Sequence, residues 1–205
     1  ICACLVGSEM CIRDSYKTSM AGLHQVSNAL TVIDAMKFVS EELPVSQESI
    51  ENGIQKAKLF GRVEVISEAP LTILDGAHNP DGMKALAYSL KAMNGKKITA
   101  VIGMHKDKNA LEAVKHLIPL VSSFTAVDGF SDERLDLDKN ELAELIIKAG
   151  GNARPAQDSI INEIRKAREE APNGAALICG SLFLAAYVKT NSDKLFKESH
   201  LKNTK

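Results

Sequence analysis

The chain of 205 residues contains no tryptophan, and aromatic residues make up only 4% of it. Proteins that bind single-stranded nucleic acid stack bases on aromatic side chains, so this scarcity argues against such a surface. The formal net charge is −1, so no overall field draws the chain to nucleic acid or to an anionic membrane. No apolar run approaches the length that crosses a bilayer, which argues against a membrane-spanning segment.

Cysteines that could pair or bind metal are also scarce. Three of the four, Cys2, Cys4 and Cys11, crowd the start of the chain, and only Cys179 lies in its body. No second cluster of Cys or His follows at the spacing of metal ligands, so we expect neither a metal site nor a disulfide framework. Cys179 lies in an apolar run and is interpreted as a small buried side chain. This cysteine usage predicts a cytoplasmic protein.

Two glycine-rich phosphate-binding motifs are absent as well. No Gly-x-x-x-x-Gly-Lys-[Ser/Thr] loop occurs anywhere in the chain. No Gly-x-Gly-x-x-Gly sequence opens a helix after the first strand, which argues against a dinucleotide-binding module of the common type.

The first fifteen residues look foreign to the rest of the sequence. The run from Leu5 to Asp14 corresponds to DNA that resembles the adapter left by a transposase-based sequencing library. We therefore expect residues 1–15 to be translated adapter, with native sequence beginning near Tyr16 and the natural protein extending further toward its N-terminus. Such a stretch is expected to make few contacts with the body.

Two patterns follow along the chain. Apolar residues at helical spacing predict an amphipathic helix over 22–39, and a second, shorter helix is predicted over 46–58. From Gly61 onward, short apolar strands alternate with helices, which predicts an α/β, Rossmann-like fold: a mainly parallel sheet with helices on both faces. The strands are expected at 63–66, 71–74, 98–102, 124–127, 152–155 and 175–179, and the helices at 80–93, 109–117, 139–149, 160–170 and 182–189. The polar, Lys-rich residues 191–205 are predicted to form a flexible tail.

Polar clusters follow three of these strands, where ligands of such sheets collect. After residue 74 come Asp75, which can accept ribose hydroxyls, and His78, which can face a phosphate near a helix N-terminus. Capping of the turn by Asp75 and of the helix by Asn79 explains the same residues equally well.

The residues of the other two clusters, and of one helix, can likewise be interpreted either as ligand-binding or as structural. Lys106 can bind an anionic substrate or belong to a solvated loop, and Ser181 can help to hold a carboxylate or simply cap a helix. His24 and Asn28 share one helix face and can contact a nucleotide base, although an ordinary amphipathic helix also accounts for them.

Five sequence blocks in fixed order resemble the C-terminal signature of folylpolyglutamate and dihydrofolate synthases, members of the Mur ligase superfamily. They are Gly22-Leu-His-Gln-Val-Ser-Asn-Ala29, Phe60-Gly-Arg-Val-Glu64, Leu74-Asp-Gly-Ala-His-Asn-Pro80, Gly103-Met-His-Lys-Asp107 and Cys179-Gly-Ser-Leu-Phe-Leu-Ala185. The third block is the most specific. The resemblance runs from about Gly22 to Lys189, and one departure is His105, where the family usually has an acidic residue.

The resemblance implies an ATP-dependent ligase that adds L-glutamate to dihydropteroate or folate through an acyl phosphate. It implies that Asn28 contacts adenine, Arg62 the phosphates and Asp75 the ribose, with His78 as the catalytic residue near the γ-phosphate. Lys106 and Ser181 would face the incoming glutamate. ATP and Mg²⁺ are the implied cofactors, and the Mg²⁺ ligands would lie in an N-terminal ATPase domain that this chain lacks. The partners expected are therefore small molecules, with no nucleic acid or membrane, and the protein is expected to be a monomer.

The same resemblance divides the chain. Residues 16–42 would be the end of the central ATPase domain, 43–60 a connector, 61–190 the glutamate ligase domain and 191–205 the tail.

A peptidoglycan-building Mur ligase shares the Ala-His-Asn-Pro sequence but not the preceding Asp-Gly. A non-catalytic nucleotide-binding module is the alternative outside the enzymes. We expect the isolated chain to be inactive, because phosphoryl transfer needs a phosphate-binding loop and a bound metal ion.

Overall fold

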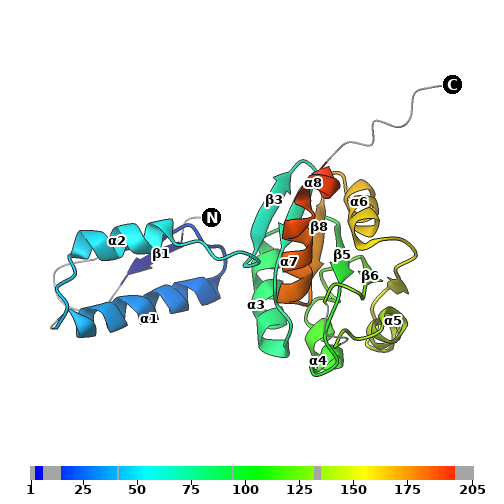
Figure 1. Ribbon diagram of the computed structural model, residues 1–205, viewed down its shortest axis with the longest axis horizontal. Helices are drawn as coiled ribbons and strands as arrows, with labels where there is room; N and C mark the ends of the chain where they lie inside the picture. The colour runs from blue at the N-terminus through cyan, green and yellow to red at the C-terminus, as the bar shows by residue number, and fades with distance from the viewer. Residues whose placement is uncertain (1–2, 7–14, 41, 94, 132–134, 197–205) are drawn as a thin grey trace.

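The computed structural model describes residues 3–6, 15–40, 42–93, 95–131 and 135–196. The chain forms two parts joined by one connection, a helical hairpin and a larger α/β part (Figure 1). The hairpin part contains β1 (Ala3–Val6), β2 (Ser15–Thr18), α1 (Leu23–Val39) and α2 (Gln47–Lys56). Among the described helices, none combines the length and apolar character needed to cross a lipid bilayer.

The α/β part is built on a six-stranded sheet in the order β3-β4-β8-β5-β6-β7. Its strands are β3 (Glu64–Glu68), β4 (Leu71–Leu74), β5 (Ile98–Ile102), β6 (Ser123–Ala126), β7 (Ala153–Pro155) and β8 (Ala175–Cys179). Only the edge strand β3 runs antiparallel to its neighbour, and all other pairs are parallel. Every residue of β5 and β8 is buried, because both strands lie in the middle of the sheet with helices over each face.

Helices cover both faces, as the alternating pattern predicted. The sheet shares one apolar core with α3, α4 and α5, and a second core with α6, α7 and α8. Alternate residues of β8 divide between these cores, Leu177 to the first and Ile178 to the second. The helices are α3 (Pro80–Leu90), α4 (Ala110–Lys115), α5 (Lys139–Lys148), α6 (Ile160–Glu170), α7 (Leu182–Thr190) and α8 (Ser192–Phe196), and a short 3₁₀ helix, η1 (Lys91–Met93), continues α3.

The hairpin part has a small core of its own. Tyr16 of β2, Ile33 of α1 and Ile54 of α2 are buried together, and the amide of Gln47 donates a hydrogen bond of 2.7 Å to the Tyr16 hydroxyl. Residues 43–60, predicted as a connector, therefore carry a helix that shares a core with α1.

The two ends of the chain differ from the prediction. Backbone pairing between Ala3–Val6 and Ser15–Thr18 joins the start of the chain to the body, a contact that the adapter hypothesis did not include. Ile12 and the side chains of Leu5 and Val6 lie outside the described residues, so the origin of residues 1–15 stays a prediction. At the other end, α8 occupies part of the expected tail, because Leu195 is buried against the second core.

Packing of α6 on the sheet gives a direct test of this architecture. Ile164 of α6 is completely buried, whereas Ile147 of α5 is 55% exposed. We expect Ile164→Ala to lower the free energy of unfolding by about 2–5 kcal/mol, because it leaves a cavity in the second core. The matched change Ile147→Ala should alter it by no more than about 0.5 kcal/mol. Urea unfolding followed by circular dichroism measures both values, and equal losses would contradict this packing.

Candidate functional site at the carboxyl edge of the sheet

The strand ends that carry the predicted polar clusters meet at one edge of the sheet. β4 and β5 both pair in parallel with β8, so Asp75, Gly103 and Gly180 follow three adjacent strands in the same direction. The amide of Asp75 donates a hydrogen bond of 2.9 Å to the Ile178 carbonyl, and that of Gly103 donates one of 3.2 Å to the Cys179 carbonyl. The structure thus places Ser181 at the same edge as Asp75, the arrangement that the site hypothesis requires.

Two glycines let these loops approach closely. Gly180 has a φ of 104°, and a Cβ atom there would lie 2.4 Å from the Gly103 carbonyl oxygen. A Cβ atom on Gly76 would lie 2.2 Å from a methyl carbon of Leu182 at the start of α7. Any larger residue at either position would push the loops apart.

Asp75 is a buried carboxylate with two structural partners. One oxygen accepts a hydrogen bond of 2.7 Å from the Ala77 amide, and the other accepts one of 2.8 Å from the Val63 amide. Burial raises the pKa of Asp75 above its ordinary value, although these two amides and the nearby charges of Arg62 and His24 oppose the rise. Asp75 therefore ties the loop after β4 to the connection from the hairpin, and its ribose contact stays a prediction.

A chain of polar side chains runs along α1 beside this carboxylate. The Gln25 side chain is buried, with its nitrogen 2.9 Å from Nε2 of His24 and its oxygen accepting the Asn28 amide at 3.2 Å. Burial, with the charge of Arg62, lowers the pKa of His24, while Asp75 raises it; the net shift is downward, so the imidazole is mostly neutral at pH 7. Neutral His24 accepts a hydrogen bond from the Gln25 amide through Nε2.

The sequence analysis missed Gln25, although a signal was present. Gln25 lies four residues before Ala29 and eight before Ile33, on the side of α1 that is buried. A polar residue in the apolar stripe of a helix needs a hydrogen-bond partner, and here it finds two on its own helix.

Asn28 and Arg62 line two adjoining hollows, one within the hairpin part and one at the junction of the two parts. Asn28 borders a hollow of about 490 Å³ between α1 and α2, whose walls are largely apolar. Arg62 borders a larger hollow of about 1000 Å³ between the hairpin and the sheet. Three residues line both hollows and join them: Met20, Lys58 and Leu59. A largely apolar slot with two side-chain amides, Gln25 and Asn28, beside a cationic chamber is suited to a base and its phosphates.

Of the remaining predicted residues, His78 and Ser181 have local structural partners, and Lys106 has no ion-pair partner among the described residues. Nδ1 of His78 lies 2.9 Å from the Gly76 carbonyl oxygen and donates a hydrogen bond to it, which holds the ring against the loop after β4. The Ser181 hydroxyl is buried and accepts the Phe183 amide at 3.0 Å, which makes Ser181 the N-cap of α7. Lys106 is exposed and forms no ion pair with any described residue.

The loop after β5 departs from the expected pattern at His105, and the structure shows what accompanies the change. The His105 ring stacks on Phe130 with centroids 5.6 Å apart and contacts Phe183 at 5.1 Å. Its Nε2 lies 3.3 Å from an oxygen of Asp136, an ion-pair distance without hydrogen-bond alignment. Asp136 also accepts the backbone amides of Phe130 and Ser131, so His105 belongs to a closed cluster. The sequence analysis identified neither Phe130 nor Asp136.

No cluster of three or more His, Cys, Asp or Glu side chains within the described part of the chain has the arrangement of a metal site. Cys179 is free and completely buried, and burial raises the pKa of its thiol, as expected for an unreactive apolar position.

The fold defines an α/β domain with a mostly parallel six-stranded sheet covered by helices on both faces. The glutamate ligase domain of the Mur ligase family matches residues 61–182, and the chain belongs to that family. The dihydrofolate synthase/folylpolyglutamate synthase of Bacillus subtilis is 30% identical over 186 residues, which cover 88% of this chain and 42% of that protein. The enzyme of the same name from Escherichia coli is 32% identical over 164 residues, 78% of this chain and 36% of that protein.

Solved structures agree with this assignment. Escherichia coli FolC in complex with DHPP and ADP superposes with a TM-score of 0.70 at 28% identity, covering 82% of this chain and 39% of that one. The bifunctional folylpolyglutamate synthase/dihydrofolate synthase of Yersinia pestis, complexed with AMPPNP and a Mn ion, superposes with a TM-score of 0.71 at 29% identity. The match covers 87% of this chain and 41% of that one. The chain thus spans about two fifths of the length of these relatives.

The structural role of Asp75 can be tested by removing its carboxylate. Asp75→Ala leaves the buried amide of Ala77 and the partly buried amide of Val63 without their acceptor, and we expect the free energy of unfolding to fall by about 1–3 kcal/mol. Asp34→Ala on the exposed face of α1 is the control, with an expected change within about 0.5 kcal/mol. Urea unfolding at pH 7 measures both, and an unchanged stability for Asp75→Ala would contradict the structural role.

Proposed function

We propose that this chain is the C-terminal part of an ATP-dependent ligase that adds L-glutamate to dihydropteroate or a folate. One observation carries the proposal: Asn28, Arg62 and Asp75 come from different elements yet are linked around one junction. Asn28 connects through Gln25 to His24, and His24 and Arg62 both act electrostatically on Asp75. The relatives that resemble this chain at about 30% identity carry names that describe this chemistry, which supports the choice of substrate.

The proposed reaction has two steps. A folate carboxylate oxygen attacks the γ-phosphorus of ATP, which forms an acyl phosphate and releases ADP. The glutamate amine then attacks the acyl carbon, the amide bond forms, the amine loses a proton and inorganic phosphate leaves. Catalysis of this kind depends on positioning and on neutralising phosphate charge.

The residues of this chain would divide that work by position. Asn28 would hold the adenine in the apolar slot, and Arg62 would neutralise phosphate charge in the adjoining chamber. His78, whose Nδ1 donates a hydrogen bond to the Gly76 carbonyl, would lie near the γ-phosphate at the start of α3. Lys106 would attract the carboxylates of the incoming glutamate, and the start of α7 capped by Ser181 would face them. Mg²⁺, which offsets negative charge on the phosphates, would be held by residues outside this chain.

Nucleotide binding by the chain itself tests the first half of the proposal. We expect weak binding of ATP, measured by calorimetry, and no measurable binding of NAD, which a dinucleotide-binding module would prefer. Asn28→Ala and Arg62→Ala should each weaken ATP binding about tenfold, since each removes a polar contact to the ligand. Lys148→Ala, an exposed lysine of α5, is the matched control and should leave the affinity unchanged. Stronger binding of NAD than of ATP would exclude this function.

Glutamate incorporation tests the second half. The isolated chain is expected to show no folate-dependent ATP hydrolysis, because the described residues include neither a phosphate-binding loop nor a metal cluster. The same chain extended by the ATPase domain of a relative should join labelled glutamate to a folate acceptor, and Asp75→Ala should weaken its use of ATP. Turnover by the isolated chain would show that its catalytic residues have been misplaced, and transfer to a peptidoglycan precursor instead would favour the other Mur ligases.

A further inference from the structure

The outer face of α3 carries a row of residues that the proposed reaction does not use. Lys84, Tyr88 and Lys91 follow one another at intervals of four and three residues, so they lie on one side of the helix, and all three are exposed. Met83 and Leu86 lie on the opposite side and are buried against the sheet. The two lysines are separated by about 10 Å along the helix axis.

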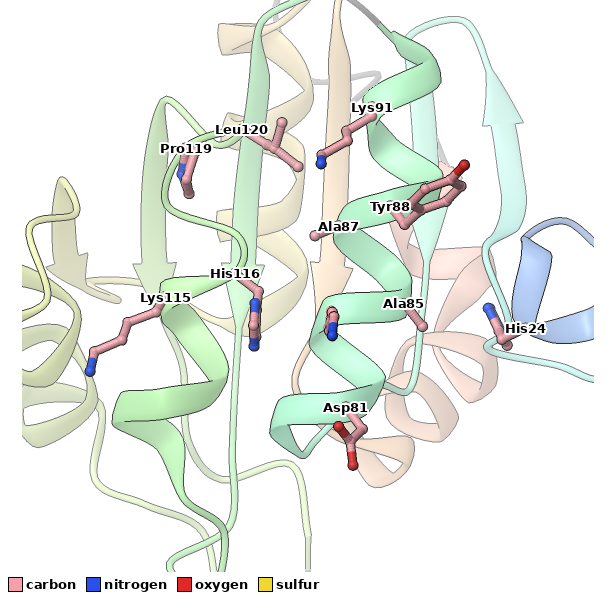
Figure 2. A pocket seen from close by; sticks show the side chains of 11 residues that line it. His24, Asp81, Ala85, Ala87, Tyr88, Lys91, Lys115, His116, Pro119 and Leu120 are labelled. Atoms are coloured by element: carbon pink, nitrogen blue, oxygen red, sulfur yellow. The ribbon is translucent and has the colours of Figure 1, made fainter.

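A trough runs beside this row. It begins as a hollow of about 620 Å³ between α3 and the segment from Lys115 to Leu120 (Figure 2). It continues into a second hollow of about 710 Å³ that reaches Lys96 and Lys97. Lys91, Pro119 and Leu120 line both hollows, so the two form one groove, here called the α3 trough. Figure 2 shows Lys91 extending from α3 toward Leu120 across it.

The charge of the α3 trough is strongly one-sided. Among its described lining residues the only acid is Asp81. Lys84, Lys91 and Lys96 form no ion pair with any described residue, whereas Lys115 is paired with Glu112. The whole chain has a net charge of −1, so this cationic strip is a local concentration rather than a reflection of overall composition.

The walls between these charges are apolar. Ala87 of α3 lies on one side, and Pro119 and Leu120 lie on the other, whereas Ala85 faces His24 across the helix (Figure 2). Lysines along the rim and apolar side chains on the floor suit an extended ligand that alternates carboxylates with methylene groups. The lysines can bind the carboxylates, and the apolar side chains can contact the methylene groups.

The position of the trough connects it to the candidate site. α3 begins at Pro80, directly after His78 and its cap Asn79, and Asp81 in its first turn lines the trough. His24, which acts on Asp75, lines the same hollow. The groove therefore starts beside the loop where the folate carboxylate would react, and runs along α3 to Ile98 at the opposite edge of the sheet.

From this geometry we infer that the α3 trough binds an extended polycarboxylate, namely the γ-linked oligoglutamyl tail of the folate substrate. The inference rests on the proposed function, since it takes the substrate's reacting end to lie at the loop after β4. Lys84, Lys91 and Lys96 bind successive carboxylates of the tail, and its methylene groups lie on Ala87 and Leu120.

Binding of γ-linked tetraglutamate to this chain, measured by calorimetry at low salt, tests the inference. Tetraglutamate should bind at least fivefold more tightly than γ-linked diglutamate, because it reaches more of the lysines. The double variant Lys84→Gln, Lys91→Gln should lose at least fivefold in affinity for tetraglutamate. The matched double variant Lys37→Gln, Lys148→Gln removes the same charge from exposed positions on α1 and α5 and should bind as the unchanged chain does. Raising the salt concentration should weaken binding, since exposed charges are screened.

Three results would overturn the inference: no binding of tetraglutamate, equal binding by the Lys84→Gln, Lys91→Gln variant, or equally tight binding of a single-stranded oligonucleotide of the same charge. ATP titrations on the same samples separate this failure from that of the proposed function. If ATP binds and Asn28→Ala weakens it while tetraglutamate does not bind, only the trough assignment fails. If neither ligand binds, the proposed function fails with it.

Discussion

The buried carboxylate of Asp75 holds the candidate site together. Its two oxygens accept amides from Val63, on the connection to the hairpin, and from Ala77, in the loop after β4. A second bond, from the Gly76 amide to the Gly61 carbonyl at 2.7 Å, closes the same junction. A carboxylate removed from water must find such partners, because burial without them disfavours the charged form. The orientation of the helical hairpin against the sheet therefore depends on a residue that also lies at the edge of the sheet where the candidate site is.

This junction explains why the residues of the site are spread so widely along the chain. A parallel sheet brings the ends of β4, β5 and β8 to one edge whatever the length of the crossovers between them. The hairpin adds Asn28 and His24 from the other side, so the hollow of Asn28 within the hairpin opens beside the hollow of Arg62 between the two parts. Closure of the loops at that edge then depends on Gly76 and Gly180, where a side chain would meet its neighbour.

Much of the fold could be predicted because its signals are local. The strands Ile98–Ile102 and Ala175–Cys179 were predicted correctly, since both are short apolar runs covered on each face. α8 was missed because Ser192, Asp193 and Lys194 are polar, and only burial of Leu195 against the second core makes that turn part of the domain. The core shared by α1 and α2 was likewise not predictable from either helix alone.

Of the candidate site, the sequence by itself determined which polar residues follow the strands and which blocks resemble the ligase family. Those features depend on residue type and order, which tertiary structure does not alter. Only the folded chain decided that Asp75 has two amide partners, that Gln25 links His24 to Asn28, and that His105 is enclosed by Phe130, Phe183 and Asp136. Most of these contacts join residues that are distant in sequence, and the Gln25 network depends on burial of one face of α1. The packing of whole helices and strands determines the distant contacts and this burial, and local sequence patterns do not specify that packing.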